Sequence, residues 1–126
     1  MTDSVAAGGV PLSEHFSLHE FTCKCGCKRT YVEPELIDLL EKIREHFGRP
    51  VIISSGYRCP KHNKAVGGGP NSQHIFGKAA DINVIGVSPA KVQQFLADHE
   101  GGLGAYLTFT HVDVRGRMAR WKGETA

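Results

Sequence analysis

The chain of 126 residues has a length typical of one domain, and its 40% hydrophobic and 22% charged residues exclude a largely disordered protein. Its formal charge of +2 is too small to favour nucleic acid or an anionic membrane, so we expect neither as a partner, and we expect a monomer. Seven histidines and 15 glycines are unusually high counts, and they direct attention to metal or proton-transfer sites and to turns.

The segment 1–12 is polar and glycine-containing, which predicts a flexible N-terminal arm before a single domain over 13–126. It has neither the basic start nor the apolar core of a signal peptide. No stretch of the sequence approaches the roughly 20 apolar residues that a membrane-spanning helix requires. We therefore expect synthesis in the cytoplasm without a signal peptide.

A first helix is predicted from Pro34, a residue suited to the first helical turn. Apolar residues then repeat at spacings of three and four and form one face of the helix: Leu36, Ile37, Leu40, Ile43 and Phe47. Gly48 and Pro50 end this helix. The apolar run 51–54 that follows predicts a short buried strand.

Residues 55–72 are rich in glycine and proline and show no periodic pattern, which predicts a long loop of the kind that is usually functional. The run 79–84 predicts a second strand. Ser88 and Pro89 open a second helix, which is expected to continue to the glycine pair 101–102. Its apolar stripe is Val92, Phe95 and Leu96.

The C-terminal part alternates between apolar and polar residues over 106–109 and 111–114, as one long strand or as a pair of strands does. Trp121 is expected to pack the tail onto the body of the domain. The complete order of elements predicts an α+β fold with a small, mostly antiparallel sheet and flanking helices.

Most of the histidines have the surroundings of ordinary surface residues. His15, His19, His46 and His99 lie among charged or polar neighbours, and His62 lies in the glycine-rich loop. His74 and His111 differ, because His74 closes that loop and His111 begins an apolar alternation.

A carboxylate is expected near these two histidines, because Asp81 lies inside the apolar run 79–82 and a buried charge is costly unless it is paired or bound to a metal. Two imidazoles and one carboxylate are a ligand set that leaves the fourth position on zinc open. The same residues are equally consistent with a hydrogen-bonded His–Asp pair in the core.

Several motifs resemble one known family. They are Ser54-Ser55-Gly56-Tyr57-Arg58, Asn63, Val66-Gly67-Gly68, the string Ser72-x-His74-x-x-Gly77-x-Ala79-x-Asp81, and His111-Val112-Asp113. Together they resemble the zinc D-alanyl-D-alanine carboxypeptidases, peptidoglycan peptidases that share a fold with the hedgehog signalling domain. This resemblance extends over about residues 12–121. It implies a hedgehog/DD-peptidase-like fold and one catalytic zinc ion bound by His74, Asp81 and His111, with Arg58 over the site.

Arg58 and Ser72 are the predicted substrate-binding residues. A guanidinium pairs bidentately with a carboxylate, such as the one that ends D-Ala-D-Ala, or it stabilises the oxyanion of acyl transfer. Arg58 is therefore also a candidate catalytic residue. Ser72 is expected to form hydrogen bonds with the loop or the substrate and not to act as a nucleophile.

The general base is not given by the resemblance, because Phe109 and Thr108 occupy positions where relatives carry a histidine or an acid. Asp113 is the candidate, since it shares a strand face with His111. An alternative role for Asp113 is to accept a hydrogen bond from an imidazole and so orient it.

Four cysteines complete the candidate sites: Cys23, Cys25, Cys27 and Cys59. A disulfide to Cys59, reduced thiols, and a second zinc site of four thiolates are all compatible with the sequence. The one-residue spacing differs from the usual Cys-x-x-Cys knuckle, which favours a disulfide or free thiols over a metal.

The sequence thus predicts a zinc metallopeptidase acting on peptidoglycan stem peptides, of the D-Ala-D-Ala carboxypeptidase type. Two alternatives are a phage-type endopeptidase (lysin) and a zinc-bound interaction module without turnover. A lysis enzyme of a phage or prophage would explain how a chain without a signal peptide reaches the cell wall after release.

Overall fold

The computed structural model describes residues 10–123, so residues 1–9 of the expected N-terminal arm lie outside the described residues. The three arm residues that are described are joined to the segment that follows them. The backbone N–H of Leu18 donates to the carbonyl of Val10 at 2.7 Å, and that of Leu12 donates to the carbonyl of Phe16 at 2.8 Å.

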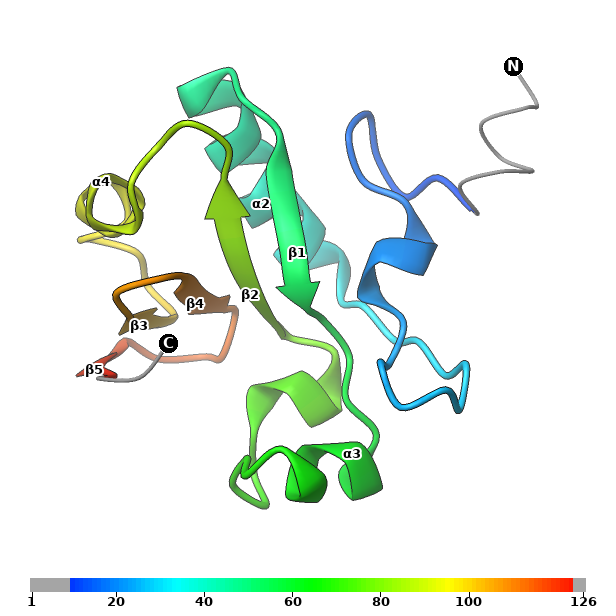
Figure 1. Cartoon of the computed structure of the whole chain (residues 1–126). Coiled ribbons are helices and arrows are strands. Elements are labelled where there is room, and N and C mark those ends of the chain that lie inside the picture. The colour runs from blue at the N-terminus through cyan, green and yellow to red at the C-terminus, as the bar shows by residue number, and fades with distance from the viewer. Residues whose placement is uncertain (1–9, 124–126) are drawn as a thin grey trace.

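Within residues 10–123 the chain forms a five-stranded sheet with the order β1-β2-β4-β3-β5 (Figure 1). The strands are β1 (Val51–Ser55), β2 (Ala79–Val84), β3 (Gly102–Ala105), β4 (Thr110–Asp113) and β5 (Ala119–Lys122). Strand β5 is parallel to β3, whereas the other three pairings are antiparallel. The predicted α+β class with a mostly antiparallel sheet is confirmed.

The helices of the same region are α2 (Pro34–Phe47), α3 (Pro60–Ala65) and α4 (Pro89–Phe95), with short 3-10 helices η1 (Leu18–Phe21) and η2 (Gln73–Phe76). Helix α2 has the predicted bounds, because Pro34 occupies its first turn and Gly48 ends it in the left-handed conformation, with φ of 63°. None of the helices described is long and apolar enough to cross a membrane.

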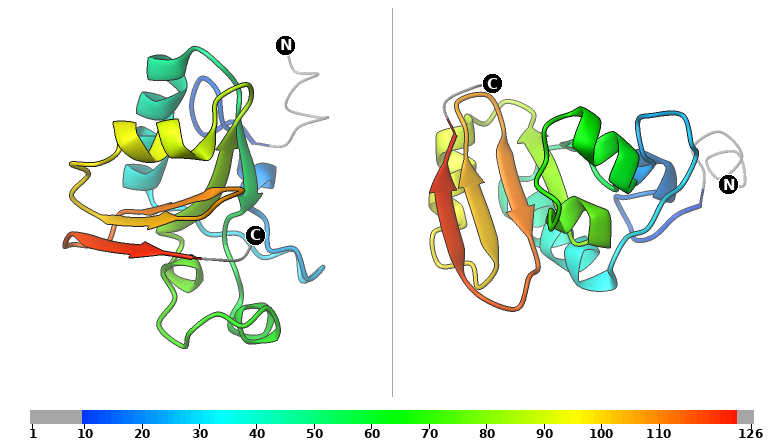
Figure 2. Two further views of the ribbon diagram at one scale, coloured as in Figure 1. Left: turned by 60° about the vertical axis from the view of Figure 1, so that its left-hand side comes forward. Right: turned by 90° about the horizontal axis from the view of Figure 1, so that it is seen from below.

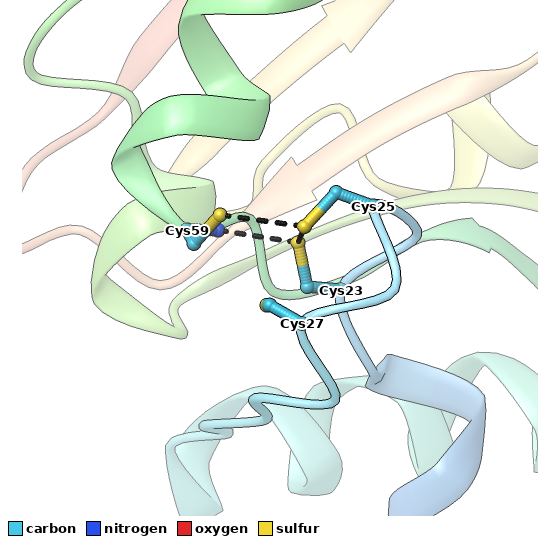
Figure 3. A group of neighbouring side chains, drawn as sticks. All are labelled: Cys23, Cys25, Cys27 and Cys59. Atoms are coloured by element: carbon cyan, nitrogen blue, oxygen red, sulfur yellow. Dashed lines mark hydrogen bonds between the residues drawn. The ribbon is translucent and has the colours of Figure 1, made fainter.

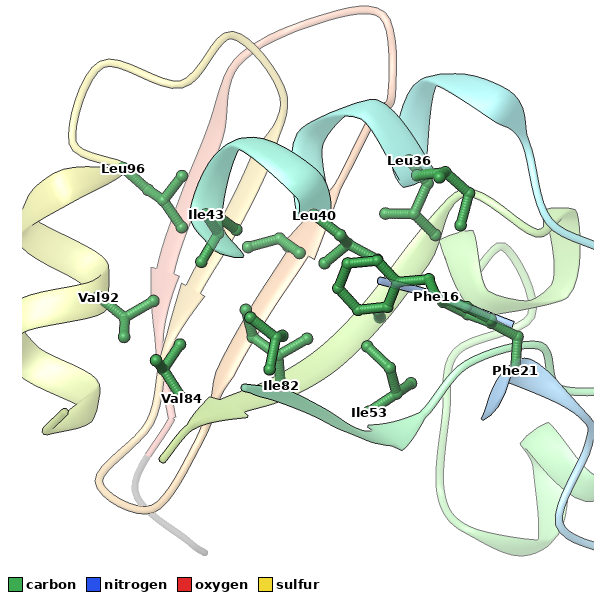
Figure 4. Packing of buried hydrophobic residues seen from close by; sticks show 14 of the residues in the cluster. Phe16, Phe21, Leu36, Leu40, Ile43, Ile53, Ile82, Val84, Val92 and Leu96 are labelled. Carbon is green, nitrogen blue, oxygen red and sulfur yellow. The ribbon is translucent and has the colours of Figure 1, made fainter. Parts of the chain in front are cut away.

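The hydrophobic core lies between the sheet and helices α2 and α4 (Figure 4). Alternate residues of β2, Ala80, Ile82 and Val84, belong to this core, as does Val112 of β4. Helix α3 lies on the opposite side of the sheet, together with the connections before and after it (Figure 2). The two faces of β2 and β4 are therefore covered differently. The hydrophobic core lies against one face, and the segment 55–78, which includes α3 and η2, lies against the other.

The predicted long loop over 55–72 is partly wrong, because it contains helix α3. This helix has only six residues, and its sequence, PKHNKA, has no apolar stripe that a periodicity search could detect. It is stabilised locally: Pro60 occupies the first turn, and the thiol of Cys59 caps the N-terminus by accepting the N–H of His62.

Two further predictions need correction. Helix α4 ends at Phe95 instead of continuing to Gly101, and Phe95 is 40% exposed, with its ring stacked on His46 and not in the core. Residues 106–109, predicted as strand, form the turn between β3 and β4, and the preceding strand is Gly102–Ala105. The glycine-rich sequence GLGA lacks the β-branched residues that would have indicated a strand.

Candidate metal centre

The three predicted metal ligands converge in the structure. Nε2 of His74 lies 3.3 Å from Oδ1 of Asp81, and Nδ1 of His111 lies 3.1 Å from the same oxygen. The potential ligand atoms all lie within 4.8 Å of one another. The three residues are buried, with 2%, 8% and 8% of His74, Asp81 and His111 exposed. One carboxylate oxygen therefore faces two imidazole nitrogens.

The sheet register places two of these residues side by side. Asp81 of β2 pairs directly with His111 of β4. Because the next residue, Ile82, belongs to the hydrophobic core, Asp81 projects from the other face of the sheet. His74 reaches the same point from η2, where the hydroxyl of Ser72 accepts the N–H of His74 at 3.3 Å. Ser72 thus forms the predicted hydrogen bond with its own loop.

Each imidazole is oriented by a hydrogen bond on its far side. Nδ1 of His74 lies 2.7 Å from the carbonyl oxygen of Gly56, so Nε2 is the nitrogen that faces Asp81. Nε2 of His111 lies 2.7 Å from Oδ2 of Asp113, so Nδ1 faces Asp81. Carbonyl and carboxylate oxygens only accept, so both outer nitrogens carry protons and both inner nitrogens are lone-pair donors when the rings are neutral.

The residues fit a zinc ion. Ligand atoms about 2.0–2.1 Å from a tetrahedral zinc lie roughly 3.3 Å from one another, close to the 3.3 and 3.1 Å found for His74 and His111 to Asp81. Two nitrogens and one oxygen are the donor atoms that catalytic zinc sites use. The His74–Asp81–His111 group is therefore able to hold a metal.

The charge of Asp81 agrees with this assignment. Burial raises the pKa of Asp81, but hydrogen bonds from His111 and His74 outweigh burial and hold this pKa well below its usual range. Asp81 is thus ionised at neutral pH, the state that a metal requires. Burial lowers the pKa of His111, but hydrogen bonds to Asp113 and Asp81 raise it overall, so metal binding has to displace a proton from this imidazole.

Comparison with known proteins agrees with the geometry. Residues 14–113 match the sequence profile of Peptidase M15. The chain belongs to the Peptidase M15 family. This confirms the family resemblance and the hedgehog/DD-peptidase-like fold class expected from the sequence motifs.

One curated relative of this M15 domain is the probable peptidoglycan L,D-endopeptidase MepK of Haemophilus influenzae. The two sequences are 33% identical over 103 residues, which cover 73% of this chain and 55% of the relative. The chain therefore spans about half the length of that protein.

Asp113 of the M15 domain is fully buried, and both of its carboxylate oxygens are engaged. Oδ2 accepts from His111 and from Nη2 of Arg115, each at 2.7 Å, and Oδ1 accepts from Nε of Arg115 and from the N–H of Gly102, each at 2.9 Å. Burial raises the pKa of Asp113, but hydrogen bonds from His111 and Arg115 hold it well below its usual range. This geometry matches the orienting role.

Arg115 was not identified as a site residue from the sequence. Its position two residues after Asp113 places both side chains on the same face of a strand, which was a usable signal. His99 was placed at the surface by the sequence pattern, yet its Nε2 lies 2.7 Å from the carbonyl oxygen of Asp113. Arg115 therefore helps to fix the carboxylate that orients His111, whereas His99 contacts only the backbone of Asp113.

Arg58 lies beside the metal ligands, as predicted. Its guanidinium donates to Oδ2 of Asp81 at 3.3 Å, to Oδ1 of Asn63 at 3.2 Å and to Oγ of Ser55 at 3.1 Å. Asp81 thus presents one oxygen to the imidazoles and the other to Arg58. Among the described residues these contacts use three of the five N–H groups of the guanidinium.

A cleft of about 500 Å³ opens over the metal ligands. The glycine-rich segment 67–69 and Ser72 line one part of it, and Tyr106, Phe109 and Trp121 line another. The rings of Tyr106 and Phe109 stack with centroids 4.2 Å apart. The buried ligand group therefore faces an open, partly aromatic cleft.

Gly102→Ala is expected to disturb this centre. A Cβ at position 102 would lie 2.2 Å from Oδ2 of Asp113, and that carboxylate is held on all sides by its hydrogen bonds. We expect the free energy of unfolding to fall by about 1–3 kcal/mol, and zinc affinity to fall about tenfold or more as the orientation of His111 is lost. Denaturant titration and competition with a zinc chelator measure the two effects.

Gly116→Ala is the matched control, because a Cβ at position 116 meets no atom within 4 Å. Zinc affinity of Gly102→Ala equal to that of Gly116→Ala would contradict the proposed steric link between Gly102 and the metal centre.

Proposed function

We propose that this M15 domain is a zinc-dependent peptidase that hydrolyses peptide bonds of peptidoglycan stem peptides. The observation that carries the proposal is the buried His74–Asp81–His111 group, whose ligand atoms converge beneath an open cleft. Membership of the Peptidase M15 family supports it, as does a relative whose name specifies peptidoglycan.

Zinc bound by these three residues would supply Lewis-acid chemistry, lowering the pKa of a water ligand and polarising a carbonyl. The protein's own groups prepare the site for this chemistry. Arg58 has its charge paired with Asp81, and among the described residues two of its N–H groups have no partner and are free to donate to an uncharged carbonyl oxygen of the substrate. Ser72 lines the same cleft and holds η2, which carries His74.

Between the two roles considered for Asp113, we favour orientation of His111 over general base. A general base must reach the proton that it takes. Asp113 is 0% exposed and is shielded by His111 and Arg115. Its low pKa also makes it a weak proton acceptor.

Cleavage of an internal peptide bond is favoured over removal of a terminal D-alanine. A carboxypeptidase needs a cation for the free carboxylate of its substrate. The described cations that line the cleft are Arg58 and Arg115, and each already contacts a carboxylate, Asp81 and Asp113 respectively. The relative named as an endopeptidase supports the same choice.

Digestion of purified, cross-linked peptidoglycan tests the proposal, with fragments identified by mass spectrometry. An endopeptidase converts cross-linked fragments into smaller peptides without release of free alanine. Free alanine with intact cross-links would replace the endopeptidase proposal with the D-Ala-D-Ala carboxypeptidase type. Binding of the zinc-loaded protein to peptidoglycan without any released fragment would favour the interaction module and reject the enzyme.

A further inference from the structure

A second group of potential metal ligands lies away from the candidate active centre. The thiols of Cys23, Cys25, Cys27 and Cys59 have sulfur atoms within 4.8 Å of one another (Figure 3). Sγ of Cys25 lies 3.5 Å from Sγ of Cys23 and 3.6 Å from Sγ of Cys59. All four cysteines are free thiols in the structure.

The backbone turns sharply to bring three closely spaced cysteines to one point. Gly26 and Lys28 both have positive φ, 93° and 66°. Such a conformation suits glycine but is uncommon for lysine. The N–H of Cys23 donates to the carbonyl of Arg29 at 2.9 Å and closes the turn. The one-residue spacing differs from the usual Cys-x-x-Cys knuckle, but this turn makes it compatible with convergence of the three thiols.

The surroundings of the sulfurs suit thiolates. The sulfur of Cys23 accepts the backbone N–H of Cys59 at 3.4 Å, and the sulfur of Cys59 accepts that of His62, also at 3.4 Å. The sulfur of Cys27 accepts the N–H of Arg29 at 3.5 Å. Three basic residues lie in the same turn and offset negative charge: Lys24, Lys28 and Arg29.

The geometry points to a second, structural zinc site formed by Cys23, Cys25, Cys27 and Cys59. Sulfurs about 2.3 Å from a tetrahedral zinc lie roughly 3.8 Å apart, close to the 3.5 and 3.6 Å contacts of Cys25. Four thiolates leave no open position, so the site is closed, as structural zinc sites are. Each thiol releases its proton on binding.

This zinc ion would join the turn 22–29 to the segment that carries Arg58. Cys59 follows Arg58 directly and caps helix α3, and the N–H of neighbouring Tyr57 donates to the carbonyl of Phe21 at 2.9 Å. The second site therefore supports the loop that places a guanidinium beside Asp81, without itself contacting the cleft.

Metal content of the reduced protein loaded with zinc tests the proposal. We expect two zinc ions per chain in the wild type and one in the double variant Cys25→Ser/Cys27→Ser, whose two substituted positions are exposed. Lys61→Ser, at an exposed position of helix α3, is the control and should retain two. His74→Ala should retain the thiolate site alone.

Cobalt provides a readout that does not depend on the cysteine variant folding correctly. His74→Ala loaded with cobalt should show intense thiolate-to-cobalt charge-transfer absorption, and X-ray absorption of its zinc form should show sulfur ligands at about 2.3 Å. If the wild type binds a single zinc ion per chain and His74→Ala binds none, the proposed second site is overturned. A disulfide among these four cysteines in the freshly purified protein, before any reductant is added, or two zinc ions in the cysteine double variant, would overturn it equally.

Discussion

His74→Ala is expected to abolish peptidoglycan hydrolysis and to lower the zinc content by one ion per chain. Nε2 of His74 lies 3.3 Å from Oδ1 of Asp81 and is one of three atoms placed to hold the catalytic metal. Metal assistance contributes several kcal/mol to transition-state stabilisation, which corresponds to a loss of roughly a thousandfold or more in rate. Elemental analysis and the rate of fragment release measure the two effects.

The control for this variant is His19→Ala, which removes an exposed histidine. It should retain wild-type zinc content and rate. Full zinc retention in His74→Ala would remove His74 from the ligand set. Loss of zinc without loss of hydrolysis would instead reject a catalytic role for this metal, and with it the proposed function.

Asp113→Asn is expected to weaken zinc binding at the His74–Asp81–His111 group about tenfold to a hundredfold, the usual effect of losing a partner that orients a ligand. The amide cannot accept from His111, Arg115 and Gly102 as the carboxylate does. A partner left unsatisfied should also lower the free energy of unfolding by about 1–3 kcal/mol. Hydrolysis measured across a zinc titration should recover toward the wild-type rate once the site is full.

Asp98→Asn, at an exposed position, is the matched control and should behave as the wild type. If Asp113 is the general base, Asp113→Asn will reach full zinc occupancy but remain on the order of a hundred- to ten-thousandfold slower. A low plateau at full occupancy would therefore contradict the orienting role and restore the base role that the strand pattern suggested.

The sequence by itself determined the elements with strong local signals. Helix α2 has a proline in its first turn, an apolar face at spacings of three and four, and a glycine at its end, so its bounds were predictable. The strands β1 and β2 were found from short apolar runs. Asp81 was a candidate ligand because a charged residue interrupts such a run, and the family resemblance implied the complete set of His74, Asp81 and His111.

Tertiary structure decided the features that depend on residues far apart in the chain. The register of β2 against β4 sets Asp81 opposite His111, and the hydrogen bond between Nε2 of His111 and Asp113 leaves Nδ1 facing the centre. The glycine-rich strand β3 has little strand propensity and is formed by its pairing with β4 and β5.

The cysteines show most clearly which features the sequence determines and which the tertiary structure determines. Their spacing alone favoured a disulfide or free thiols, because it differs from the usual Cys-x-x-Cys knuckle of zinc sites. The positive φ angles of Gly26 and Lys28 turn the chain so that Cys23, Cys25 and Cys27 lie together. Cys59 follows Cys27 by 32 residues in the sequence, and only the fold brings it to the other three. Local sequence patterns determine periodicity and caps, whereas a ligand set is defined by distances that only packing of the whole chain determines.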